Sequence, residues 1–113
     1  MLAAQNRLRR RRDFQQLFRG GRVVRGKHLI LRAIPNPSTA LVGFVVSSTI
    51  FKNATDRNRL KRQLRGIVRE LGVLPKIHCM FSATTAARHQ SYETLAHEVD
   101  FLFQQLQRQT ARR

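Results

Sequence analysis

The chain has 113 residues, room for one domain but not for two independent cores, because single cores run to roughly 100–150 residues. Apolar residues make up 42% of it, so a packed interior is expected and wholesale disorder is not. Lysine and arginine number 22 against 6 acidic residues, and a small fold tolerates the resulting net charge of +16 best beside a polyanion. The composition therefore predicts a nucleic acid as partner.

Nothing in the sequence indicates export or a membrane partner. No apolar run approaches the roughly 20 residues that span a bilayer, and arginines follow Met1 to Ala4 where a signal peptide needs its apolar stretch. The single cysteine, Cys79, allows neither an internal disulfide nor zinc-finger spacing and is interpreted as a small core residue. We expect a soluble cytoplasmic protein.

The charge is concentrated in the first part of the chain. Residues 1–70 hold 17 basic and 3 acidic side chains, net +14, whereas residues 71–113 hold 5 and 3, net +2. The surface for a polyanion is therefore expected within residues 1–70.

The chain opens with a block of like charges and a short helix. Residues 1–12 are predicted to be a mobile basic arm, because an arginine run repels itself until a polyanion holds it. A short amphipathic helix is expected next, capped by Asp13 and stopped by Gly20 and Gly21.

Two strands are predicted in the middle of the chain. Residues 28–34 and 41–47 have strand character, and the prolines and polar residues of 35–38 predict a turn between them. The simplest pairing is a hairpin with a loop.

The last third holds another strand and a helix. A strand is predicted over 76–82, a loop over 82–90, and a helix from Ser91 or Tyr92 to about Gln107. Its apolar stripe is predicted to consist of Leu95, Val99, Leu102 and Leu106. The order of elements favours an α+β fold of two layers, helices over one small sheet. Its single domain would span residues 13–108, followed by a short basic tail, 109–113.

The most informative segment is a predicted helix over 54–71. At roughly 100° per residue one face is an apolar stripe, formed by Leu60, Leu64, Ile67 and Leu71. The opposite face collects the polar residues Asn58, Lys61, Arg62, Arg65 and Arg69. It lacks the i, i+4 carboxylates that relieve repulsion on a merely solvated helix, so it is predicted to bind nucleic acid.

The ends of this helix also carry signals. Asn53 or Thr55 can cap its start, Asp56 suits the positive end of the helix dipole, and Gly72 with Pro75 marks its end. Asn58 is a poor helix former among arginines, and its amide suits a ribose, a base edge or a phosphate.

These residues resemble a known family. The run from Arg57 to Arg62, followed by Arg65 and Arg69, resembles the RNR signature helix of the bacterial ribonuclease P protein subunit. The resemblance extends to the family's first helix and to its second and third strands, through Asp13, Phe14, Phe18, Gly21, residues 29–31 and residues 43–47. The chain departs from the family pattern at Val45, Ser48, Thr49 and Gly66.

The resemblance implies a specific fold and role. The fold would be a two-layer α/β sandwich of the ribosomal protein S5 domain 2-like type, with a four-stranded sheet and a left-handed βαβ crossover. In the family the catalyst is an RNA with bound Mg²⁺, and the protein assists removal of the 5′ leader of precursor tRNA. The protein would bind the catalytic RNA with Arg57, Asn58, Arg59, Lys61, Arg62, Arg65 and Arg69. A cleft for the single-stranded leader would be lined by Phe14, Phe18, Arg32, Val45 and Ser47. Spacing alone leaves core packing equally open for the two phenylalanines.

A search for a protein active site agrees with an assisting role. The four histidines lie in no metal-ligand or triad spacing, and no Gly-rich phosphate loop precedes a helix. Catalytic and metal-binding residues are therefore not expected in the protein.

Three other classes remain open on composition. A ribosomal or other structural RNA-binding protein would have the same size and charge. A helix-turn-helix DNA-binding protein is disfavoured because no short partner helix precedes the basic helix. A protein-only nuclease would need clustered carboxylates, and residues 1–70 contain only Asp13, Asp56 and Glu70. The oligomeric state is left open.

Overall fold

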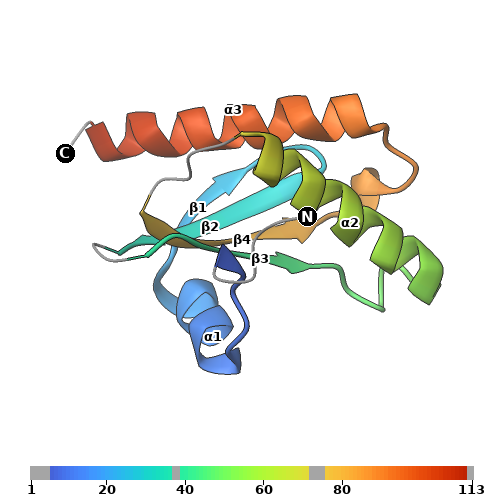
Figure 1. Cartoon of the computed structure of the whole chain (residues 1–113), viewed down its shortest axis with the longest axis horizontal. Helices are drawn as coiled ribbons and strands as arrows, with labels where there is room; N and C mark the ends of the chain where they lie inside the picture. The colour runs from blue at the N-terminus through green and yellow to red at the C-terminus, as the bar shows by residue number, and fades with distance from the viewer. Residues whose placement is uncertain (1–5, 37–38, 72–75, 112–113) are drawn as a thin grey trace.

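The computed structural model describes residues 6–36, 39–71 and 76–111. Four strands form one sheet, and three α-helices pack on it (Figure 1). In chain order the elements are α1 (Arg11–Gly20), β1 (Arg22–Arg25), β2 (Leu29–Pro35), β3 (Leu41–Val45), α2 (Ala54–Glu70), β4 (Ile77–Ala83), a short 3₁₀ helix η2 (Thr85–Ala87) and α3 (Tyr92–Ala111).

The strand order is β1-β2-β4-β3, so the predicted hairpin between residues 28–34 and 41–47 is wrong. β4 lies between the two strands, antiparallel to β2 and parallel to β3. The physical reason is burial: Cys79, Met80 and Phe81 of β4 are fully buried on both faces of the sheet, which only a central strand achieves. The strands β3 and β4 are joined by α2, a βαβ crossover.

The helices cover the two faces of the sheet unequally. α2 and α3 lie on one face and enclose the main core, whereas α1 lies on the opposite face (Figure 1). The two-layer prediction therefore describes the sheet with α2 and α3, and α1 adds partial cover on the second face. The α1 side has its own small cluster around Leu8, Leu17 and Met80.

The main core is centred on Phe81. Its ring stacks on Phe44 with ring centroids 6.1 Å apart and meets Phe103 edge-on at 5.4 Å. The predicted stripe of α3 is confirmed, because its four members are all buried: Leu95, Val99, Leu102 and Leu106. α3 continues to Ala111, past the predicted end at Gln107 and into the expected tail.

Residues 6–12 are more ordered than predicted, and residues 1–5 of the predicted arm lie outside the described residues. The expectation of a mobile arm is wrong for residues 6–12, because Leu8 is buried and its N–H donates to the carbonyl of Val42 at 2.9 Å. An apolar residue within the arginine run thus anchors it to the edge of β3. α1 begins at Arg11 after Arg10, so the predicted Asp13 cap is wrong, and Asp13 instead lies in the first turn at the positive end of the helix dipole. The predicted stop is confirmed at Gly20.

α2 is one continuous helix, as predicted. The Asn53 side chain caps it by accepting from the N–H of Thr55 at 2.8 Å. Leu60, Leu64 and Ile67 are buried as predicted. Leu71 is 39% exposed and is not part of the core.

Val68 takes the buried place that Leu71 was expected to fill, because it follows Leu64 by one turn.

The predicted helix-ending residues Gly72 and Pro75 lie outside the described residues, as does part of the predicted 35–38 turn. β1 was not predicted from the residues, since only Val24 of its four is buried. The predicted loop over 82–90 contains the end of β4 and the η2 helix.

A buried polar contact joins the β1–β2 turn to α3. The Glu98 carboxylate accepts from the backbone N–H of His28 at 2.8 Å and meets the His28 Nδ1 at 2.9 Å. Gly26 makes this approach possible, because a Cβ there would lie 2.8 Å from the carboxylate carbon. His28 is therefore a satisfied structural histidine.

The Cys79 thiol is expected to be inert in the folded protein. It is fully buried in β4, and this burial raises its pKa to about 12, so almost no thiolate is present at pH 8. Iodoacetamide at pH 8 should label the thiol only after unfolding, which mass spectrometry of native and urea-treated samples would show. Equal labelling in both states would contradict the burial.

Within the described ranges, no helix is both long and apolar enough to cross a membrane.

Candidate nucleic-acid interface

The solvent side of α2 carries a contiguous basic surface. Asn58, Lys61, Arg62 and Arg65 line one shallow hollow together with Gly66, and Arg69 is exposed one turn further along. We call the four cations and Asn58 the α2 basic face. None of these cations has an ion-pair partner among the residues that the structure describes. The face therefore offers free guanidinium and ammonium groups to an external anion.

Two of the seven predicted RNA-binding residues do not point the same way. Arg57 turns back over the start of the helix, where its Nη1 donates to the carbonyls of Phe51 at 2.7 Å and Lys52 at 3.1 Å. Arg57 thus holds the segment that enters α2. Arg59 lines a different cavity, on the flank of α2 that faces the start of α3. The helical period explains the split, because position 59 lies roughly 100° from 58 and 60° from 62.

Arg65 connects the α2 basic face to the N-terminal segment. It lines a groove with Arg7, Arg9 and Phe14, and Val42 to Phe44 of β3 form the remaining side. Arginines from two distant parts of the sequence therefore meet at one groove. Arg7 and Arg9 were not among the predicted site residues. The signal that could have found them was Leu8, the apolar residue that fixes this run to the fold.

The predicted leader cleft corresponds to the sheet face that α1 only partly covers. Phe18 on α1 is 54% exposed, and the Arg32 guanidinium of β2 lies 5.0 Å from the centre of its ring. Phe14 is packed differently: a Cβ on Gly43 would lie 2.7 Å from two atoms of its ring. Phe14 is thus seated on β3 as part of the α1-side cluster, while Phe18 keeps a free ring face.

The two remaining predicted cleft residues occupy the end of β3. Val45 lies in register with Ser82, on the α1 side of the sheet, and is partly buried. Ser47 lies in the turn that leads to α2, where its Oγ accepts from the N–H of Thr49 at 3.1 Å. The structure brings Phe18, Arg32 and Val45 to one face and gives Ser47 a turn-forming contact.

No protein metal centre is visible in the described part of the chain, where no three histidine, cysteine, aspartate or glutamate side chains are grouped. His78 is occupied by a contact between its Nε2 and the Thr39 hydroxyl at 2.9 Å.

The family departure at Gly66 has a local setting. Tyr92 of α3 lies over this glycine. The pKa of the Tyr92 hydroxyl is raised by burial, and further by a hydrogen bond to Glu70 and by the negative charge of Glu70. A protonated Tyr92 hydroxyl therefore joins the end of α2 to the start of α3.

Replacing this glycine is expected to stabilise the protein. A Cβ at position 66 would lie 3.4 Å from the Tyr92 hydroxyl, an ordinary contact, so Gly66→Ala should raise the free energy of unfolding by about 0.5–1 kcal/mol. Urea unfolding followed by circular dichroism would measure it. The matched substitution Gly43→Ala should destabilise, because its Cβ would overlap Phe14. A loss of stability in Gly66→Ala would show that α2 cannot accept the methyl group.

Known proteins resemble this chain in sequence and in fold. The family model for ribonuclease P matches residues 2–107. The ribonuclease P protein component of Pseudanabaena sp. (strain PCC 6903) is 39% identical over 103 residues, which cover 88% of this chain and 89% of that protein. The RNase P protein from Thermotoga maritima has a TM-score of 0.75 at 28% identity, covering 85% of this chain and 94% of that one. A Staphylococcus aureus RNase P protein mutant with defective mRNA degradation activity has a TM-score of 0.82 at 19% identity, covering 90% and 88%, which shows the same fold. The chain belongs to the ribonuclease P protein component family.

Proposed function

We propose that this chain, the protein subunit of ribonuclease P, binds the catalytic RNA through the α2 basic face and the 5′ leader of precursor tRNA on the sheet face beside α1. The RNA subunit then carries out the Mg²⁺-dependent endonucleolytic cleavage that removes the leader, in the bacterial cytoplasm. The protein supplies binding and positioning and no catalytic side chain.

The observation that carries this proposal is the unpaired basic helix. Four cations have no ion-pair partner in the described part of the chain: Lys61, Arg62, Arg65 and Arg69. The net charge of +16 leaves too few carboxylates to pair with every cation. A row of free cations on a rigid helix neutralises phosphates without reading sequence. This suits a structured RNA, in which phosphates and riboses are the accessible groups.

The leader proposal is supported by the free aromatic surface at α1. Phe18 presents an exposed ring with a guanidinium beside it, a combination on which an unpaired base can stack. Arg32 adds positive charge next to the sugar-phosphate backbone. Phe14 fixes α1 against Gly43 and so supports the platform, by which we mean the Phe18 ring and the Arg32 guanidinium.

The proposal assigns magnesium to the RNA. The carboxylates of residues 1–70 are Asp13, Asp56 and Glu70, which lie in the first turn of α1, the first turn of α2 and the last turn of α2. Carboxylates dispersed in this way cannot form the paired metal site that a protein nuclease uses.

Reconstituted cleavage tests the proposal. A bacterial ribonuclease P RNA would be assayed at low magnesium with precursor tRNA, alone and with the wild-type protein or with Arg62→Ala or Arg65→Ala. The wild type should stimulate cleavage, and each variant should lose stimulation. The control is Arg108→Ala, the same substitution at an exposed site on α3. A purely structural RNA-binding protein would bind the RNA without changing leader-dependent cleavage.

A further inference from the structure

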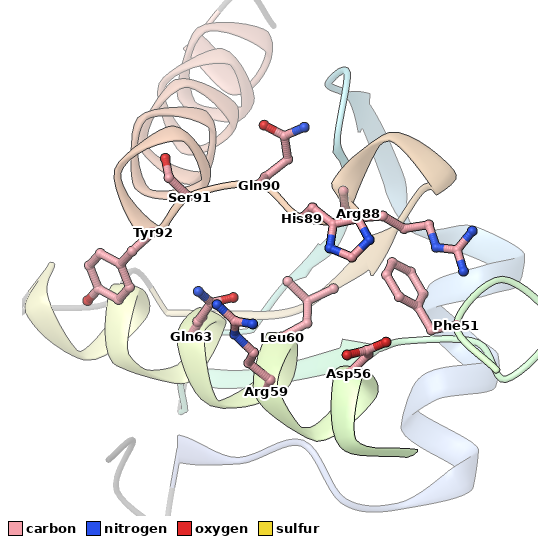
Figure 2. A pocket seen from close by; sticks show the side chains of 11 residues that line it. Phe51, Asp56, Arg59, Leu60, Gln63, Arg88, His89, Gln90, Ser91 and Tyr92 are labelled. Atoms are coloured by element: carbon pink, nitrogen blue, oxygen red, sulfur yellow. The ribbon is translucent and has the colours of Figure 1, made fainter. Parts of the chain in front are cut away.

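A separate cavity lies between the first half of α2 and the segment that connects η2 to α3 (Figure 2). Its volume is about 310 Å³, within the range of ligand pockets, roughly 300–1,000 Å³. The apolar part of its lining is buried, with Phe51, Leu60 and Ala87 each less than 6% exposed. This cavity is distinct from the α2 basic face and from the leader surface.

One wall of the cavity carries polar side chains whose hydrogen-bonding groups are left open in the described part of the chain. Asp56, Arg59 and Gln63 project from successive turns of α2 toward it (Figure 2). Among the residues that the structure describes, none of these side chains has a hydrogen-bond or ion-pair partner. Asp56 and Arg59 form no ion pair in the structure, although opposite charges at this i, i+3 spacing on a helix can pair. The wall therefore offers both donors and acceptors.

The opposite wall carries two flat side chains. The Arg88 guanidinium lies 5.8 Å from the centre of the Phe51 ring, and the His89 ring points into the cavity (Figure 2). His89 has a backbone φ of 60°, a left-handed conformation that few non-glycine residues adopt and that often marks a functional position.

The hydroxyl of Ser91 beside these two side chains is already engaged. It accepts from the N–H of Thr94 at 3.1 Å and caps α3. Ser91 is thus held in a structural contact, and the remaining polar groups of the lining are suited to binding.

We propose that this cavity binds an unpaired guanine nucleotide of RNA. A cavity suited to phosphate alone would not carry the carboxylate of Asp56, because a negative charge repels anions. A carboxylate has two acceptor oxygens, and guanine presents two adjacent donors, N1–H and the N2 amino group, on its Watson–Crick edge. Asp56 accepts from these donors, Arg88 and His89 stack on the base, and Arg59 meets the phosphate. The identification of this RNA as the catalytic RNA rests on the proposed function.

The site itself can be tested without any RNA subunit. The full chain, labelled with ¹⁵N, would be titrated with GMP, with CMP and with inorganic phosphate, and chemical shifts would be followed by NMR. GMP should move the Gln63 side-chain amide and the backbone signals of His89, and Asp56→Asn should weaken GMP binding about tenfold or more. The matched control is Glu93→Gln, which removes the first-turn carboxylate of α3 outside the cavity. Equal responses to GMP, CMP and phosphate would overturn the proposal.

A second measurement distinguishes this site from the α2 basic face. Asp56→Asn should weaken binding to the catalytic RNA about tenfold with an unchanged salt slope, whereas Arg62→Ala should lower the slope by about 1. GMP binding with no effect of Asp56→Asn on RNA affinity would overturn the RNA assignment. If wild-type protein neither binds the catalytic RNA nor stimulates cleavage, the proposed function fails, while the GMP titration still decides the cavity.

Discussion

Binding of the catalytic RNA is expected to weaken about 10³- to 10⁵-fold when monovalent salt is raised from 50 to 200 mM. The reason is counterion release: neutralising roughly 6–10 phosphates liberates condensed cations, and added salt opposes that gain. The cations expected to contact these phosphates are those of the α2 basic face, and Arg7 and Arg9 line the adjacent groove. Titrations by filter binding at several salt concentrations would give the slope directly.

Variants give this prediction a control. Removing two phosphate contacts in the double variant Arg62→Ala and Arg65→Ala should reduce the salt slope by about 2. Arg108→Ala on α3 should leave it unchanged, because that residue lies outside the hollow and the groove. A slope near zero for the wild type would mean that α2 does not contact phosphates.

Stimulation of cleavage should be largest at low magnesium and should shrink by about tenfold or more as magnesium is raised. Positive charge on the protein and magnesium ions both neutralise RNA phosphates, so each reduces the need for the other. Single-turnover cleavage rates of precursor tRNA, measured with and without protein across a magnesium series, would show it.

The same series can separate RNA binding from leader binding. Phe18→Ala should reduce stimulation only with substrates that carry a leader long enough to reach the platform beside Arg32. The variant Phe101→Ala is a matched control, since it removes an exposed phenylalanine from α3.

For the wild-type protein, equal stimulation of cleavage at every magnesium concentration would contradict the electrostatic account.

Features encoded locally were predictable from the sequence. The α2 helix, its buried stripe and its basic face follow from a 3.6-residue period that any reader can trace from Leu60 to Ile67. The cap by Asn53 and the stop at Gly20 are also local, because a cap depends on side chains within a few residues. The basic composition already indicated a polyanion as partner.

Features that depend on distant contacts were not predictable in this way. The hairpin prediction failed because β2 and β3 look like neighbours in sequence, while the more buried β4 takes the place between them. The mobile-arm prediction failed because the contact of Leu8 with β3 holds the arginine run in place despite its self-repulsion. The direction of Arg57 depends on the loop carbonyls that it meets.

The sequence by itself determined the chemistry of the surface: an amphipathic helix with arginines on one side, and a net charge of +16 that favours an anionic partner. Only the tertiary structure decided which of those residues act together. It placed Arg65 in a groove with the N-terminal arginines, Arg59 at the cavity between α2 and the segment that connects η2 to α3, and Arg57 at the loop that enters α2. The physical reason is that side-chain periodicity is a property of a single element, whereas grooves and cavities form between elements that close in space only when the core packs.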